Sequence, residues 1–162
     1  MENLESLKEF SRETFYASFG DRNSPENMLL YDVHHFADEQ LRSELLNPYS
    51  RFFFAKLGED IVGYMKINQA DAQTVLPNDG GMELERIYVG QQLKGRGIGK
   101  ALLEKTVRLA KKAGAMYIWL GVWEHNTQAI SFYERNGFLT CSQHNFRLGN
   151  DEQTDLLMKR IL

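Results

Sequence analysis

The stretch MELERIYVGQQLKGRGIGK, from Met82 to Lys100, combines a strand-like segment, a glycine-rich turn and the start of a helical pattern. Its spacing predicts a strand over residues 82–89 and a helix over residues 98–113. The turn carries three glycines and three basic residues, which are Gly95, Gly97, Gly99, Lys94, Arg96 and Lys100. Backbone N–H groups at a helix N-terminus favour an anion, so the turn is a candidate phosphate site. A tight connection without a ligand would explain the glycines equally well.

The turn does not match the two common nucleotide motifs. A dinucleotide fingerprint would require glycine where Lys100 stands, and a P-loop would require Ser or Thr where Ala101 stands. The turn does match Q-x-x-G-x-G through Gln92, Gly95 and Gly97. In this respect it resembles the acyl-CoA pyrophosphate loop of the GNAT N-acetyltransferases, which also lies between a strand and a helix.

Composition indicates one globular domain spanning residues 1–162, with 43% apolar and 25% charged residues. Cys141 is the only cysteine, which excludes an internal disulfide and favours a reducing cytoplasmic location. The first ten residues do not have the pattern of a secretory signal, and no apolar run approaches the ~20 residues that span a bilayer. The net charge of −3 argues against a general nucleic-acid binder. We therefore expect neither nucleic acid nor a membrane as a partner.

Upstream of the turn, helical spacing predicts helices over residues 4–19, 25–36 and 38–46. Ser24 is the expected N-cap of the second helix, with Pro25 at its first position. Residues 52–57 and 61–68 are expected to form a β-hairpin. Residues 70–81, which include Pro77, are expected to form a polar loop. Neighbouring His34 and His35 would point about 100° apart on a helix, which disfavours joint ligation of a metal.

Two carboxylates lie on the strand that leads into the turn. Strict alternation would place Glu83 and Glu85 on one face together with Ile87 and Val89. The other face would carry Met82, Leu84, Arg86 and Tyr88. A strand that serves only for packing rarely combines carboxylates with apolar residues on one face, so the pattern favours a functional role. An exposed strand end is the alternative.

Downstream of the turn, the apolar run over residues 115–123 predicts a strand that is buried on both faces. Asn126 is the expected N-cap of a helix that ends before Gly137, and Asn126 and Tyr133 fall on one helical face. Residues 138–148 and 154–162 are expected to form two antiparallel strands. The combination N-x-x-A-x-x-F-Y with a downstream N-G-F resembles the second acyl-CoA segment of the GNAT family.

Further segments are similar to the bacterial Pai-type spermidine/spermine N-acetyltransferases. These are NSPENM at 23–28, DAQ at 71–73, LERIY at 84–88, IWLGVWE at 118–124 and EQTD at 152–155. The resemblance implies an α/β fold with a mixed, mostly antiparallel sheet flanked by helices. A central parallel strand pair would be splayed around acyl-CoA. The first strand usual in the family is expected to be absent, because this sequence enters a helix almost at Met1.

The resemblance also implies a chemistry, namely direct attack of a primary amine on acetyl-CoA without a metal. Glu85 matches the general base that acts through water, and Tyr133 matches the acid that protonates the leaving thiolate. The remaining acetyl-CoA contacts are expected from Ile87, Tyr88, Val89, Lys94, Gly95, Arg96, Gly97, Ile98, Gly99, Lys100 and Asn126. Glu83, Glu85, Trp123 and Glu124 are the expected substrate-binding residues. Asp71 and Asp79 would add to an acidic groove suited to ammonium groups.

Alternatives remain open on the sequence alone. A protein N-terminus or a lysine is a rival acceptor within the same enzyme class. A regulatory protein that binds acetyl-CoA without efficient turnover belongs to another class. The expected partner is a small-molecule amine, and the expected oligomeric state is a monomer or homodimer.

Overall fold

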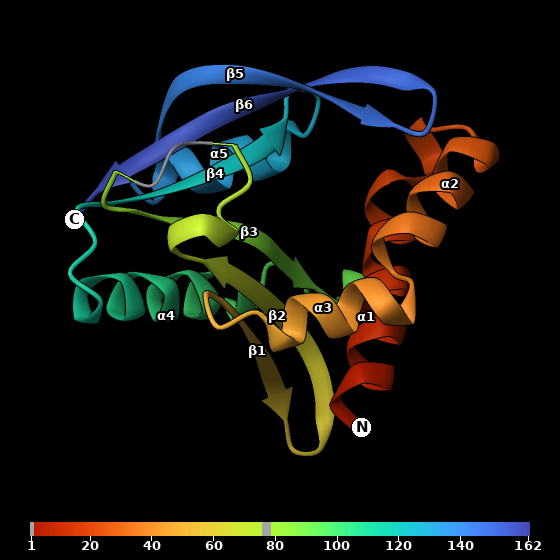
Figure 1. Ribbon diagram of the computed structural model, residues 1–162, viewed down its shortest axis with the longest axis horizontal. Helices are drawn as coiled ribbons and strands as arrows, with labels where there is room; N and C mark the ends of the chain where they lie inside the picture. The colour runs from red at the N-terminus through yellow and green to blue at the C-terminus, as the bar shows by residue number, and fades with distance from the viewer. Residues whose placement is uncertain (1, 76–78) are drawn as a thin grey trace.

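The computed structural model describes residues 2–75 and 79–162 (Figure 1). Its helices are α1 (Glu2–Phe19), α2 (Pro25–His35), α3 (Asp38–Leu46), α4 (Ile98–Lys112) and α5 (Thr127–Arg135). Its strands are β1 (Ser50–Leu57), β2 (Asp60–Asn68), β3 (Gly81–Val89), β4 (Tyr117–Trp123), β5 (Leu139–Leu148) and β6 (Asp151–Ile161). Short 3₁₀ turns lie at Gly20–Arg22, Ala70–Ala72 and Gln91–Leu93.

Two helices, α2 and α5, begin at a residue whose side chain accepts a hydrogen bond from one of their first N–H groups. Ser24 Oγ accepts a hydrogen bond from the Asn27 N–H at 3.2 Å, and Pro25 opens α2. Asn126 Oδ1 accepts from the Ala129 N–H at 3.2 Å and so caps α5. Gly137 follows α5 with a φ of 83°, which is the left-handed conformation that glycine adopts without strain. Both predicted caps are therefore confirmed.

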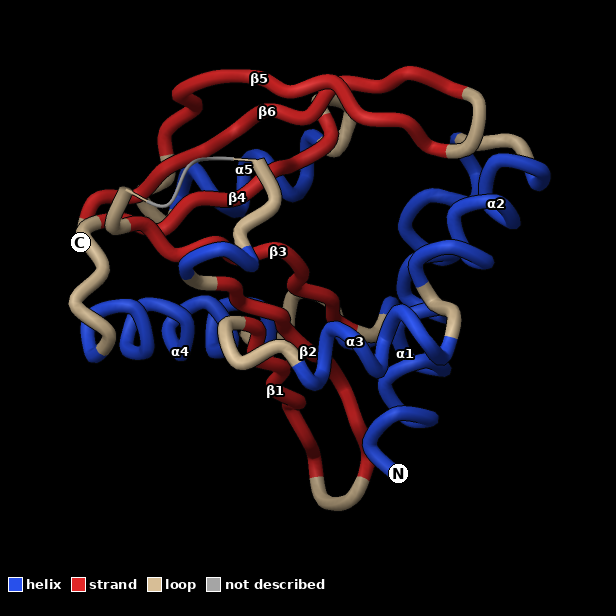
Figure 2. Tube along the Cα trace, in the orientation of Figure 1, coloured by secondary structure: helices blue, strands red, loops and turns tan. Residues whose placement is uncertain are grey.

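The strands form one six-stranded sheet in the order β1-β2-β3-β4-β6-β5 (Figure 2). The β3–β4 pair is parallel, and every other neighbouring pair is antiparallel. This confirms the mixed, mostly antiparallel sheet and the predicted β1–β2 hairpin. Three helices precede β1, which is the first strand in the described residues. In the predicted polar loop, residues 76–78, including Pro77, lie outside the described residues.

The two faces of the sheet carry different clusters of apolar side chains. On the face that we call the α4 face, Leu103 of α4 and Tyr133 of α5 pack in one core with Met65 of β2. On the opposite face, the α1 face, Leu7 of α1 and the α3 side chain Leu41 pack against Tyr64. Since successive side chains of a strand point to opposite faces, Tyr64 and Met65 separate the two clusters.

The parallel pair β3–β4 separates after a short ladder. Pairing covers Gly81 with Tyr117, Met82 with Ile118 and Glu83 with Trp119. Beyond these residues β3 continues to Val89 and β4 to Trp123 without pairing to each other. The sheet therefore opens on the carboxyl side of this pair, and the β4-facing edge of β3 is left unpaired there. The predicted splayed pair is confirmed.

A β-bulge on β3 changes which residues share a face. Lys66 pairs with Arg86 and Ile67 pairs with Leu84, so Glu85 is the extra residue on β3. The bulge interrupts the alternation. Met82, Leu84, Ile87 and Val89 all belong to the core on the α4 face, whereas Tyr88 packs on the α1 face. The prediction that Glu83 and Glu85 share a face with Ile87 and Val89 is therefore wrong, because strict alternation does not cross a bulge.

Candidate active site

The glycine-rich turn presents unpaired main-chain donors at the start of α4. Gly95 and Gly97 have φ values of 80° and 85°, and Gly97 is the N-cap residue of α4 without a side-chain cap. The first intrahelical bond of α4 runs from the Ala101 N–H to the Gly97 carbonyl. The N–H groups of Ile98, Gly99 and Lys100 therefore have no partner within the helix.

Positive charge surrounds these donors. The side chains of Lys94, Arg96 and Lys100 are exposed on the turn, where they are free to contact an anion. The helix dipole adds a partial positive charge at the same end of α4. The turn thus has the donors, the charge and the open space that a pyrophosphate requires.

Close packing brings the turn to the opening between β3 and β4. A Cβ on Gly99 would lie 3.8 Å from both Val89 Cγ2 of β3 and Phe132 Cζ of α5. A Cβ on Gly63 of β2 would lie only 2.9 Å from the Tyr88 carbonyl oxygen and 3.3 Å from Leu102. Gly63 therefore allows α4 to lie directly on the sheet. The turn and the unpaired edge of β3 thus lie next to each other, which is an arrangement that suits an extended acyl-CoA arm.

Tyr133 lies on α5 beside Phe132, the side chain that a Cβ on Gly99 would contact. Its side chain is 8% exposed and packs in the main core, with its ring centroid 5.7 Å from that of Phe138. Burial raises the pKa of Tyr133 above the ordinary value of a phenol. The hydroxyl therefore keeps its proton at neutral pH, as a general acid must. Asn126 uses its Oδ1 as a helix cap, which leaves its Nδ2 as the group able to contact a ligand.

The two predicted carboxylates of β3 meet at Asn68 of β2. Asn68 Nδ2 donates to Glu83 Oε2 at 2.9 Å and to Glu85 Oε2 at 2.5 Å, and Ser50 Oγ donates to Asn68 Oδ1. Glu83 is 2% exposed and also accepts from the N–H and hydroxyl of Thr74. Burial raises the pKa of Glu83. Its oxygens are satisfied within the protein, so Glu83 lies behind the surface that a substrate would reach.

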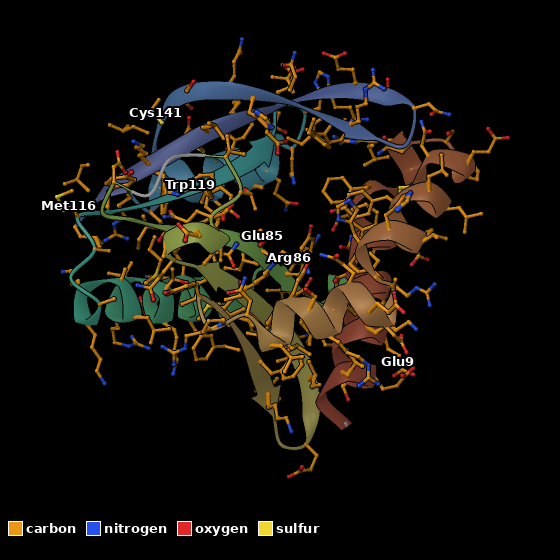
Figure 3. The ribbon with its side chains drawn as sticks, in the orientation of Figure 1. Glu9, Glu85, Arg86, Met116, Trp119 and Cys141 are labelled. Carbon is orange, nitrogen blue, oxygen red and sulfur yellow. The ribbon has the colours of Figure 1, made fainter. Side chains whose placement is uncertain are left out.

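Glu85 belongs to a buried network of two cations and two carboxylates. Glu85 Oε2 lies 2.6 Å from Lys66 Nζ, and Glu85 Oε1 lies 3.1 Å from Arg86 Nη2. Glu44 of α3 lies 3.1 Å from Lys66 and binds Arg86 through two hydrogen bonds of 2.8 and 2.9 Å. Figure 3 shows Glu85 and Arg86 near the centre of the molecule. We call Glu44, Lys66, Glu85 and Arg86 the neutralised network.

The pKa shifts in this network follow from its ion pairs. Burial raises the pKa of Glu44, but Arg86 and Lys66 lower it more, so the net shift is downward. Burial lowers the pKa of Arg86, but Glu85, Tyr64 and Glu44 raise it more. Both groups are therefore charged near neutral pH. The network ties α3 to the centre of the sheet.

The other predicted acidic and aromatic residues are spread over a wider area. Trp123 ends β4, where its ring lies 6.0 Å from that of Phe19, and Glu124 beside it is exposed. Asp71 is exposed on a 3₁₀ turn. Asp79 accepts a hydrogen bond from the Tyr117 hydroxyl at the other end of β3 from the glycine-rich turn. The structure thus brings Glu83 and Glu85 together but not all the members of the predicted groove.

Several site residues were missed by the sequence analysis. Lys66 and Asn68 are two residues apart on β2, and this spacing was a usable signal for a shared face. Glu44 had no such signal, because its partners are distant in the sequence. Asp155 of β6 was quoted in a motif but was given no role, although its carboxyl group lies on the α1 face beside Gly121.

Within residues 2–75 and 79–162, no three His, Cys, Asp or Glu side chains come together as possible metal ligands. No helix in these ranges is both long enough and apolar enough to cross a membrane.

Comparison with known proteins agrees with this geometry. The Acetyltransferase (GNAT) family model matches residues 4–138. An uncharacterised N-acetyltransferase in the pepI 3′ region of Lactobacillus delbrueckii subsp. lactis is 40% identical over 152 residues, which are 94% of this chain and 88% of that protein. The spermidine N(1)-acetyltransferase of Thermoplasma acidophilum is 27% identical over 142 residues, which are 85% and 83% of the two chains.

The fold has similar neighbours among solved structures. The PaiA N-acetyltransferase of Thermoplasma acidophilum in complex with coenzyme A superposes with a TM-score of 0.80 at 24% identity, covering 99% of this chain and 94% of that chain. The family model and the 40% identical relative decide the assignment. The chain belongs to the GNAT family of acetyl-CoA-dependent N-acetyltransferases.

Proposed function

We propose that this acetyltransferase acts on a primary amine of a polyamine such as spermidine or spermine, and that its affiliation is Pai-type. The observation that carries the proposal is the opening between β3 and β4, which adjoins a sheet face on which the carboxylates of Glu85 and Asp155 lie. Glu83, on the same face, is enclosed by Asn68 and Thr74. Carboxylates near an acceptor site favour cationic substrates. The 27% identity to a spermidine N(1)-acetyltransferase supports the same substrate class.

The proposed cofactor contacts come mainly from the main chain. The N–H groups of residues 95–100 would hold the pyrophosphate, supported by Lys94, Arg96 and Lys100. The unpaired edge of β3 at Ile87, Tyr88 and Val89 would contact the arm and the thioester carbonyl. The Tyr88 side chain stacks on Tyr64 with ring centroids 5.6 Å apart, so Tyr88 contributes through its backbone. The Asn126 amide would complete the contacts.

Bound acetyl-CoA supplies an activated thioester, and the protein supplies the proton transfers. Glu85 is the proposed base, acting through a water molecule, because a protonated amine is not a nucleophile. Lys66 and Arg86 already contact its carboxylate, so these cations also fix its orientation. Tyr133, protonated in its buried setting, is the proposed donor to the leaving thiolate. Trp123 and Glu124 are proposed to flank the path of the amine substrate. We further propose that residues 1–162 form a single catalytic domain.

The test is acceptor-dependent release of thiol from acetyl-CoA by the purified chain. Spermidine and spermine should accelerate release well above a lysine peptide and a control without acceptor. Glu85→Gln should reduce turnover on the order of 10²-fold, the usual contribution of a general base. Glu59→Gln, at an exposed carboxylate in the β1–β2 turn, is the matched control and should retain activity. Thiol release that is accelerated by the lysine peptide but not by spermidine or spermine would overturn the polyamine assignment.

A further inference from the structure

Asp155 places a carboxylate over the centre of the sheet, close to the opening between β3 and β4. It lies on β6 opposite Trp123. Its side chain leans across β4, since a Cβ added to Gly121 would lie 3.1 Å from Asp155 Oδ2. Only a residue without a side chain leaves full room for the carboxylate at this position. Gly121 therefore forms the floor beneath Asp155.

The Asp155 carboxylate has no partner among the described residues, in contrast to Glu85. Among residues 2–75 and 79–162, no group donates a hydrogen bond to this carboxylate or forms an ion pair with it. The residue is partly buried. Burial alone raises the pKa of Asp155 to about 6. Two cations on this side of the sheet, Arg22 and Lys159, contact other groups. Arg22 donates to the His125 carbonyl and lies over the Trp123 ring, and Lys159 lies over Tyr117.

A second unsatisfied acceptor lies on the same face of β6. Gln153 is 9% exposed, and its Nε2 donates to Asn23 Oδ1 at 2.7 Å and to Asp151 Oδ2 at 2.9 Å. These two bonds fix the amide so that Oε1 is the remaining group, and Oε1 has no donor among the described residues. Gln153 and Asp155 are two residues apart on the strand, so their side chains project from one face. Together they present one buried and one partly buried acceptor that have no donor among the described residues.

The position of Asp155 suits a nitrogen that stays protonated. Adjacent strands are ~4.8 Å apart, so the β6 backbone lies about 10 Å or more from the unpaired edge of β3. The reacting nitrogen must approach that edge and must lose its proton. An ionised carboxylate instead stabilises a nitrogen that keeps its proton. Asp155 therefore suits a second ammonium group of the same acceptor rather than the reacting nitrogen.

We propose that Asp155, with Gln153 beside it, binds a second ammonium group of the acceptor and so selects diamines and polyamines over monoamines. This inference rests on the proposed function, because it assigns a subsite for the same acceptor. Gly121 provides the space for the subsite, and Trp123 borders it.

The experiment compares 1,4-diaminobutane with n-butylamine, which differ at one end by an ammonium group. The quantity measured is the ratio of kcat/KM for the diamine to kcat/KM for the monoamine. Asp155→Asn should lower this ratio by about tenfold or more, the value of one charged hydrogen bond. Asp60→Asn removes one exposed negative charge at the β1–β2 turn and should leave the ratio unchanged. Thermal unfolding of each variant confirms that it is folded.

A direct binding measurement separates this inference from the proposed function. Calorimetry of 1,4-diaminobutane with the coenzyme A complex should show a loss of affinity of about tenfold in Asp155→Asn. If neither amine is acetylated but this loss is observed, the proposed reaction fails and the subsite stands. Equal ratios and equal affinities in wild type and Asp155→Asn would overturn the subsite.

Discussion

Two carboxylates near the β3–β4 opening have opposite surroundings. Glu85 lies in the neutralised network, where Lys66 and Arg86 contact both of its oxygens. Asp155, two strands away, has no cation and no hydrogen-bond donor among the described residues. The network that holds the first carboxylate joins α3 to β2 and β3, and it fixes the orientation in which Glu85 is proposed to act as the base. The second carboxylate is not neutralised by any cation among the described residues.

The difference separates a carboxylate that is already paired with protein cations from one that is left available to a cationic ligand. A buried ion pair whose partners are all present is satisfied, and removal of one partner leaves an uncompensated charge. A partly buried carboxylate without a partner, such as Asp155, already bears part of that cost in the folded protein. Such a cost is removed when a cationic ligand binds. We therefore place ligand recognition on the Asp155 side of the α1 face.

The largest expected effect comes from breaking the neutralised network. Arg86→Met should lower the free energy of unfolding by about 3–5 kcal/mol, because Glu44 and Glu85 lose a buried partner. Urea denaturation measures the change. The double variant Arg86→Met/Glu44→Gln should recover part of it. Asp38→Asn, which breaks the exposed Lys8–Asp38 pair, is the control and should cost much less.

Asp155→Asn should raise the free energy of unfolding, in contrast to Arg86→Met, and the size of this gain should depend on pH. The folded-state pKa of Asp155 is about 6, above the ordinary value of ~3.9, so the native state binds more protons between these values. Stability from this group is therefore lost as pH rises from about 4 to 6. The variant should gain about 1–3 kcal/mol at pH 8 and nothing at pH 4. Equal effects at both pH values would show that the carboxylate is not strained by burial.

Gly121→Ala should give the smallest change in stability. Its new methyl group would lie 3.1 Å from Asp155 Oδ2, which requires a small displacement of the carboxylate. We expect a loss of about 0.5–1 kcal/mol together with a lower preference for the diamine. Gly20→Ala, with nothing within 4 Å of the added atom, is the matched control. If Gly121→Ala leaves the preference for the diamine unchanged, Gly121 does not contribute to the subsite.

Much of the fold was predictable because its signals are local. Ser24, Pro25 and Asn126 mark helix starts through capping, and the β1–β2 hairpin follows from its strand pattern and turn. The glycine-rich turn could also be predicted, because its positive φ values and exposed N–H groups are determined by residues close together in the sequence. These features depend little on the rest of the molecule.

The surroundings of the carboxylates were not predictable in the same way. The bulge at Glu85 depends on register between β2 and β3, which sequence alternation alone does not show. Glu44 meets Arg86 from 42 positions away in the chain. Asp155 is distinctive only because Gly121 on a neighbouring strand leaves space for it. Each of these facts requires the assembled sheet.

The most direct test of the catalytic site is a single-turnover measurement on Tyr133→Phe. The variant keeps the buried ring and removes the proposed proton donor. Its Kd for acetyl-CoA should stay within about twofold of wild type, while the acetyl-transfer rate to spermidine should fall by about 10²-fold or more. An unchanged transfer rate would contradict Tyr133 as the acid and would leave the opening between β3 and β4 as a binding site only.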